Sequence, residues 1–213
     1  MKTLPLHLLL DDPTKIRDVT RVLDEGGLVC LPCGGTYRIV ADLTSETAVN
    51  HLFASKGRTQ KAPSLVFVDS EKMLAQVVAE VSPLSQRLAR HLWPGPLTIL
   101  FPAHPDLPAK VVKQLVRANG KIGVRIPDDP VVRQVLTAFG HPLLVSSANK
   151  QRKQGAASPA QIRKNFVGRV DLFVEDGDLA SRPASTVVSL DGERVSVTRA
   201  GALSEEQISA AAG

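Results

Sequence analysis

The chain has 213 residues, of which 43% are hydrophobic, enough apolar material for a sizeable core within one domain. Lysine and arginine total 26 against 21 for aspartate and glutamate, and the net charge of +5 favours an anionic partner such as a nucleotide or nucleic acid. Aromatic residues make up only 4% of the chain, which argues against base stacking as the source of affinity and favours a phosphate pocket.

Two short segments suggest other classes of protein. Cys30 and Cys33 are the only cysteines, and their C-x-x-C spacing is typical of redox or zinc sites. Two thiols cannot complete a four-ligand zinc site, and Cys30 lies in the apolar run LVCLP, so we interpret it as a small buried hydrophobe. The apolar run at residues 8–10 is too short for a secretory signal, and no later run reaches the ~18 apolar residues of a membrane helix. The sequence therefore predicts a cytoplasmic protein with no membrane partner.

Hydrophobic periodicity predicts that helices and strands alternate along the chain. Apolar residues at helical spacing predict helices over residues 14–25, 46–55, 71–81, 83–92, 108–116, 131–139 and 159–166. Short apolar runs bounded by turn residues predict strands over residues 28–31, 37–41, 64–69, 97–101, 121–126, 141–149, 170–174, 185–190 and 195–199. Asp191 and Gly192 are a strong hairpin signal between the last two strands. The pattern predicts an α/β protein with a mixed sheet.

One strand ends in a cluster of polar residues. Residues 141–149, HPLLVSSAN, are an apolar run followed by Ser146, Ser147 and Asn149. In open α/β sheets ligands bind beyond the carboxyl ends of the strands, so these side chains could line an anionic pocket together with Arg125. An arginine among apolar neighbours is costly unless it is paired or meets an anion, which makes Arg125 a site candidate. The alternative is that Ser-Ser-Ala-Asn merely caps the following segment.

A basic cluster follows the predicted helix at residues 46–55. It consists of Lys56, Arg58 and Lys61. These cations can simply complement the C-terminus of the helix. The functional alternative is a clamp on a triphosphate, in which Arg58 offers a bidentate fork and Lys56 a point charge.

The segment WPGPLT at residues 93–98 is expected to fix the geometry of a turn. Two prolines around a glycine end the preceding helix before the next strand begins. We interpret Trp93, the only tryptophan, as a packing residue at this corner, and a ligand platform is the alternative.

Six short motifs follow one another in the order and spacing of a known family. They are KGR at 56–58, WPGPLT at 93–98, VRIP at 124–127, SAN at 147–149, STVV at 185–188 and RAG at 199–201. Together they resemble the YrdC-like family of threonylcarbamoyl-AMP synthases over about residues 14–203. The resemblance implies a single domain over residues 1–213, with a twisted, mixed parallel and antiparallel sheet, flanked by helices, around a positively charged cavity.

The family forms threonylcarbamoyl-AMP and pyrophosphate from L-threonine, bicarbonate and ATP, for the threonylcarbamoyl modification of adenosine in tRNA. The resemblance therefore implies a nucleotidyltransferase without a protein nucleophile, because the reaction requires mainly positioning and charge neutralisation. Mg²⁺ is expected to arrive with ATP and to bridge its phosphates, with no ligand from the protein. RNA or a tRNA-modification protein is implied as a further partner.

The resemblance also assigns roles to residues of this chain. The expected ATP-binding residues are Lys56, Arg58, Ser147, Asn149 and Arg199. The expected residues for the amino-acid substrate are Tyr37, Arg125, Ser185 and Thr186.

The chain departs from the family pattern in the amino-acid half. Where the family has P-T-D/E-T-V-Y-G-L, residues 32–39 read PCGGTYRI, so a hydroxyl and a carboxylate are absent and Arg38 replaces a glycine. Phe67 stands where many members have a histidine. Gly34 and Gly35 are expected to make the site roomier and Arg38 to make it more anion-seeking, so threonine should bind poorly. The alternatives are a diverged paralogue with another substrate, or a catalytically silent nucleotide- or RNA-binding module.

Overall fold

The computed structural model describes residues 1–56, 65–108, 111–112, 115, 120–148 and 158–213. The chain divides into two compact units, each built from two separate stretches of sequence. Unit 1 comprises Met1–Ser64 and Asp129–Arg182, and unit 2 comprises Leu65–Asp128 and Pro183–Gly213.

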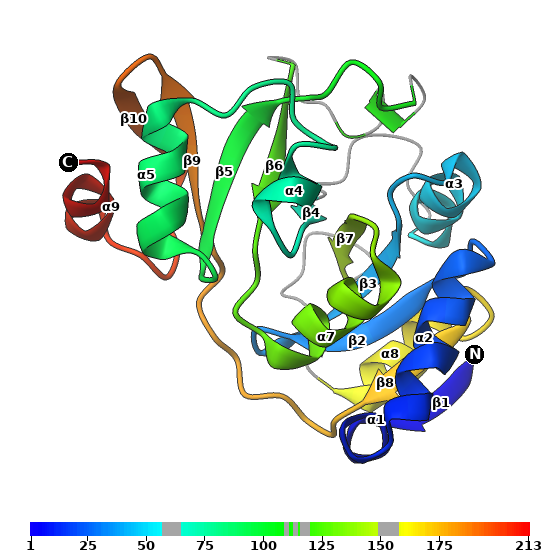
Figure 1. The fold of residues 1–213 in the computed structure, drawn as a ribbon. Helices are drawn as coiled ribbons and strands as arrows, with labels where there is room; N and C mark the ends of the chain where they lie inside the picture. Colours follow the sequence, from blue (N-terminus) through cyan, green and yellow to red (C-terminus); the bar gives the residue numbers. More distant parts are fainter. Residues whose placement is uncertain (57–64, 109–110, 113–114, 116–119, 149–157) are drawn as a thin grey trace. The chain divides into compact units, whose positions relative to one another are not determined.

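Unit 1 contains a mixed sheet with the strand order β1-β8-β2-β3-β7 (Figure 1). Its strands are β1 (Lys2–Pro5), β2 (Val29–Cys33), β3 (Thr36–Asp42), β7 (Leu143–Ser147) and β8 (Leu172–Glu175). Strand β8 is parallel to β1 and β2, whereas β3 is antiparallel to β2 and β7. Every residue of β2 is buried, in agreement with its continuous apolar run.

The helices of unit 1 begin at capping residues that the sequence already contains. They are α1 (Leu6–Asp11), α2 (Pro13–Asp24), α3 (Glu46–Ser55), α7 (Pro130–Phe139) and α8 (Pro159–Phe166). The Asp12 carboxylate accepts a hydrogen bond from the Thr14 amide at the start of α2, and Ser45 accepts one from the Ala48 amide at the start of α3. Helices α2 and α7 pack on each other and against β2 (Figure 1).

Unit 2 contains a second set of strands in the order β4-β6-β5-β9-β10. These are β4 (Leu65–Phe67), β5 (Leu97–Pro102), β6 (Lys121–Arg125), β9 (Thr186–Asp191) and β10 (Arg194–Arg199). Strand β6 is parallel to β4 and antiparallel to β5, and β5 is parallel to β9. The turn at Gly192, with φ +57°, joins β9 to the antiparallel β10 and confirms the predicted hairpin. The mixed sheet predicted from the sequence is also confirmed, whereas the charge of its cavity stays a prediction.

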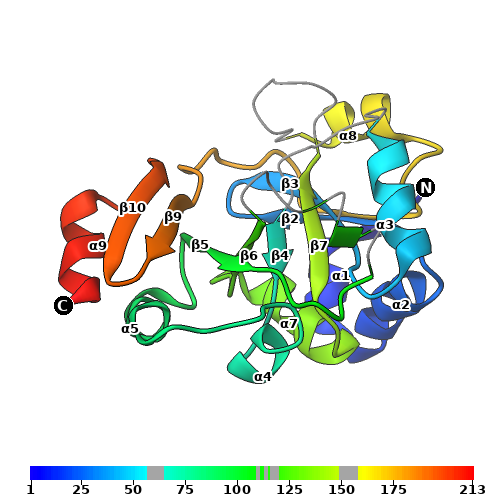
Figure 2. The same cartoon turned by 90° about the horizontal axis from the view of Figure 1, so that it is seen from above.

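The helices of unit 2 whose bounds the structure describes are α4 (Glu71–Leu74), α5 (Pro83–Leu92) and α9 (Glu205–Ala212). Helix α9 packs against α5 and β10 (Figure 2). Within the described ranges, no helix combines the length and the apolar character that crossing a membrane requires.

Some sequence predictions of secondary structure are wrong or incomplete. The helix expected at residues 71–81 ends at Leu74, because the following backbone bonds to the last residue of β5 and to the segment after it. The Ala79 amide donates to the Pro102 carbonyl at 3.0 Å, and the His104 amide donates to the Val77 carbonyl at 2.9 Å. The elements β1, α1 and α9 were not predicted. Most of the helix predicted at 108–116 lies outside the described residues.

Candidate functional site

The end of β7 lies beside the end of α3 in unit 1. Helix α3 ends at Ser55, and Lys56 is its C-cap residue. The Lys56 Nζ donates to the Ser146 Oγ at 3.2 Å and to the backbone carbonyl of Ser147. Only 2% of Lys56 is exposed, and a buried ammonium needs such polar partners to offset its desolvation. The structure thus brings together Lys56 and Ser147, two of the predicted ATP-binding residues. Arg58 and Asn149 lie outside the described residues.

Arg38 lies on the neighbouring strand at the same end. In the antiparallel β3–β7 pair, Arg38 is directly opposite Ser147. Residues opposite one another in such a pair have side chains on the same face of the sheet. The cation that replaces a family glycine is therefore next to a predicted ATP-binding residue.

The turn between β2 and β3 has a left-handed backbone at both of its glycines. Gly34 and Gly35 have φ values of +59° and +76°, as in the type I′ turns that join two-residue hairpins. A Cβ on Gly35 would lie 2.3 Å from the Ala180 carbonyl oxygen and 2.7 Å from the Arg182 amide nitrogen, whereas a Cβ on Gly34 would meet nothing within 4 Å. The expectation of a roomier site is therefore wrong at position 35, because the backbone at 180–182 fills that space.

Tyr37 is buried within unit 1. Its hydroxyl donates to the Gly177 carbonyl at 2.7 Å and accepts from the Asp176 amide at 3.0 Å. Its ring packs edge-on against Phe173, with 5.1 Å between the ring centroids. Burial raises the pKa of Tyr37 to about 12, because ionisation would place a charge in the interior. In this structure Tyr37 ties the segment after β8 to β3.

Arg125 is buried in unit 2, with 8% of the residue exposed. Its Nε donates to the Gly95 carbonyl at 2.6 Å, and its Nη2 donates to the Asp128 Oδ1 at 2.7 Å. These two partners offset the cost of burying the Arg125 guanidinium, as expected for an arginine in an apolar strand. In the parallel β4–β6 pair, Arg125 is opposite Phe67, the residue that replaces the family's histidine.

Ser185 lies between two other polar side chains of unit 2. Arg199 Nη2 donates to the Ser185 carbonyl at 2.7 Å and to the Ser185 Oγ at 3.1 Å. The Ser185 Oγ is also 2.9 Å from the Thr98 Oγ1. Thr186 is fully buried, and its hydroxyl donates to the Leu203 carbonyl and accepts from the Leu203 amide. Ser185 and Arg199 therefore form one cluster, while Thr186 fastens β9 to the segment that follows β10.

Three residues complete these clusters although sequence reasoning did not select them as site residues. Thr98 contacts Ser185, Asp128 pairs with Arg125, and Gly201 lies against the backbone before β9. A Cβ on Gly201 would lie 2.3 Å from the Ala184 carbonyl oxygen, so a side chain does not fit there. Thr98 and Gly201 belong to the motifs WPGPLT and RAG, and Asp128 directly follows the motif VRIP. Their position in or beside a motif is the feature of the sequence that could have identified them.

The two cysteines lie on β2, and both are buried as thiols. Burial raises the pKa of the Cys30 thiol, which favours its neutral form. Residues three apart on a strand project to opposite faces, so this geometry does not pair Cys30 with Cys33. Among the described residues, no group of three or more His, Cys, Asp or Glu side chains is placed to hold a metal ion. The thiols fit the interpretation of small buried hydrophobes.

The mixed sheets, the glycine turn and the polar clusters define an α/β protein with cationic and hydroxyl groups at strand ends. The family model for Sua5, YciO and YrdC, described as "Telomere recombination", matches residues 21–201. The chain belongs to this family.

Several relatives carry the name of one enzyme. The threonylcarbamoyl-AMP synthases of Pyrococcus abyssi and Bacillus subtilis are each 27% identical to this chain, over 91% and 97% of its length. The chain spans only 56% and 59% of those two proteins. A putative threonylcarbamoyl-AMP synthase of Mycobacterium tuberculosis is 31% identical over 88% of this chain and 84% of its own length.

Solved structures share the fold. A crystal structure of P. abyssi Sua5 complexed with L-threonine matches 99% of this chain and 60% of that one, with a TM-score of 0.84 and 25% identity. The E. coli YciO structure matches 92% of this chain and 94% of that one, with a TM-score of 0.80 and 19% identity. These likenesses confirm the predicted family fold.

Proposed function

We propose that this protein is a nucleotidyltransferase that forms threonylcarbamoyl-AMP and pyrophosphate from L-threonine, bicarbonate and ATP. The observation that carries the proposal is the contact of the buried Lys56 ammonium with Ser146 and Ser147 at the end of β7. This cluster presents a positive charge and a hydroxyl where ligands of α/β sheets bind. The names of the relatives supply the reaction.

In the nucleotide half, Lys56 and Arg58 would neutralise the phosphates, while Ser147 and Asn149 would orient the nucleotide. The amine of the amino acid attacks bicarbonate and forms a carbamate with loss of water. A carbamate oxygen then attacks the α-phosphorus, the bond to the bridging oxygen breaks, and pyrophosphate leaves. Fixed cations accelerate this step because they stabilise charge that develops on the phosphate oxygens. Mg²⁺ would arrive with ATP, without a ligand from the protein, and would supply further charge neutralisation at the phosphates.

In the amino-acid half, Arg125 would bind the substrate carboxylate. Its present partner, Asp128, has a side chain that is 54% exposed and can yield to a competing carboxylate. Ser185 would contact the substrate, and Arg199, which holds Ser185, would contact ATP. The hydroxyls of Tyr37 and Thr186 each donate to and accept from backbone groups of the protein, so we assign both residues to shaping the site rather than to direct contact.

A second candidate is the same reaction with an amino acid other than threonine. Phe67 opposite Arg125 offers no ring nitrogen, and Arg38 opposite Ser147 adds a cation. The loss of the ring nitrogen removes a hydrogen-bond partner for a substrate hydroxyl, and the added cation attracts a negatively charged substrate. Together the two changes favour an amino acid other than threonine. Either reaction would act in the cytoplasm, with RNA or a tRNA-modification protein as the next partner.

The proposal is tested by incubating the protein with ATP and radiolabelled bicarbonate, adding each amino acid in turn. We expect labelled nucleotide and pyrophosphate to form, and the preferred amino acid separates the two candidates. Lys56→Ala should abolish turnover, whereas Lys72→Ala, at an exposed position on α4, should not. ATP binding without labelled product for any amino acid would instead indicate a catalytically silent binding module.

A further inference from the structure

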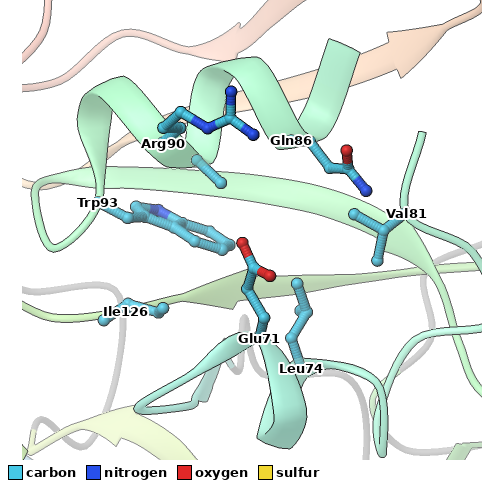
Figure 3. Close-up of a pocket in the computed structure, with 8 residues that line it drawn as sticks. Glu71, Leu74, Val81, Gln86, Arg90, Trp93 and Ile126 are labelled. Atoms are coloured by element: carbon cyan, nitrogen blue, oxygen red, sulfur yellow. The ribbon is translucent and has the colours of Figure 1, made fainter. Parts of the chain in front are cut away.

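A pocket of about 330 Å³ lies within unit 2 (Figure 3). It is lined by Glu71, Leu74, Val81, Gln86, Ala89, Arg90, Trp93 and Ile126. None of the predicted ATP-binding or amino-acid-binding residues is among them. Its volume is at the lower end of the range for ligand pockets, which suits a small metabolite better than a nucleoside triphosphate.

One wall of the pocket is apolar. Trp93 lies in this wall, where its Nε1 donates to the Leu97 carbonyl at 2.7 Å and its ring lies 6.3 Å from that of Phe101. The ring extends into the pocket near Ile126 (Figure 3). The predicted packing role of Trp93 is therefore confirmed, and the same ring also lines the pocket. Leu74 is buried beside it, so an apolar group of a ligand would be removed from water here.

Two helices bring opposite charges to the same pocket. The Glu71 carboxylate points from α4 into the pocket, and Arg90 projects from α5 on the facing side (Figure 3). Within the described part of the chain, neither side chain forms an ion pair with another residue. A ligand that carries both a cation and an anion could pair with both side chains, whereas a purely apolar ligand would pair with neither.

We propose that this pocket binds a free amino acid with a branched apolar side chain. The ammonium group would pair with Glu71 and contact the face of Trp93, which attracts cations. The carboxylate would pair with Arg90, for which a guanidinium is well suited. The hydrocarbon side chain would then pack against Leu74 and Ile126.

The pocket adjoins the groups that hold Arg125. Trp93 is two residues before Gly95, whose carbonyl accepts from Arg125, and the Gly95 amide donates to the Ile126 carbonyl at 3.1 Å. A ligand that shifts Trp93 or Ile126 therefore shifts the partners of Arg125. The bound amino acid would act as an effector of substrate affinity, an extension that rests on the proposed function.

Binding can be measured directly because Trp93 is the only tryptophan. Titration with leucine should change its fluorescence saturably, while 4-methylpentanoate, which lacks the amine, and isoamylamine, which lacks the carboxylate, should bind at least about fivefold more weakly. Arg90→Gln and Glu71→Gln should each weaken leucine binding about five- to tenfold in calorimetry. Lys72→Gln, an exposed position on α4, is the matched control.

Ala89→Leu fills the pocket from α5 without changing charge and should abolish binding. A leucine response that survives Ala89→Leu, or the absence of a response to any apolar amino acid, overturns the proposed site. Equal binding of leucine and isoamylamine would show that the pocket selects amines, which overturns the assignment of an amino acid.

The effector role has a separate readout. Saturating leucine should shift the KM for the amino-acid substrate in the natural protein and leave it unchanged in Ala89→Leu. An unshifted KM despite demonstrated leucine binding overturns the effector role. A complete lack of turnover overturns the proposed function and leaves the binding result intact.

Discussion

The two glycines of the β2–β3 turn allow one substitution to be compared in two settings. Both have positive φ, so alanine at either position costs roughly 1–2 kcal/mol of backbone energy. Only at Gly35 would the new Cβ meet backbone atoms, 2.3 Å from the Ala180 oxygen and 2.7 Å from the Arg182 nitrogen. Overpacking of this kind adds about 1–3 kcal/mol. We therefore expect Gly34→Ala to lower the free energy of unfolding by about 1–2 kcal/mol and Gly35→Ala by about 2–5 kcal/mol.

Thermal unfolding followed by far-ultraviolet circular dichroism measures this difference. For a chain of this length, 1 kcal/mol corresponds to about 2–4 °C in Tm, so Gly35→Ala should unfold at least about 2–4 °C below Gly34→Ala. Equal Tm values for the two variants would refute the packing of residues 180–182 on the turn. The same clash makes Gly35→Thr unsuitable for restoring the family pattern, so Arg38→Gly is the better single test of threonine preference.

Three other predictions address single residues. Burial raises the pKa of Tyr37 to about 12, above an unfolded value of about 10, so the stability that it contributes is present below pH ~10 and is lost as pH rises toward 12. Tyr37 is the only tyrosine, so absorbance titration of the native protein should show ionisation near 12, and a transition near 10 would contradict its burial. Arg58→Ala should weaken ATP binding by roughly 1.5–3 kcal/mol with an unaltered dichroism spectrum, and an unchanged affinity in calorimetry would exclude the phosphate clamp. Phe67→His should raise threonine-dependent pyrophosphate release about two- to tenfold, the value of one regained hydrogen bond, and an equal rise in Phe67→Leu would show that the ring nitrogen is not responsible.

Local signals in the sequence determined several elements to the residue. Helices α3, α5 and α8 run over the predicted ranges, because each has a serine N-cap directly before the apolar stripe. The hairpin at Gly192 was also predicted from the local sequence, since glycine readily adopts the positive φ that the turn needs. The ordered motifs were sufficient to indicate the family and its fold, because each occupies a short contiguous stretch.

Tertiary structure decided what depends on residues far apart in the chain. Lys56 meets Ser146, 90 residues later, only because α3 ends beside β7. Gly35 faces Ala180 because the segment after β8 returns to the β2–β3 turn, and this contact reversed the expectation of a roomier site. The apolar spacing at residues 71–81 fitted a long helix, yet pairing of the following backbone with the end of β5 and the segment after it ended α4 at Leu74. Periodicity and capping are encoded within about ten neighbouring residues, whereas such contacts depend on which strands pair and in which register.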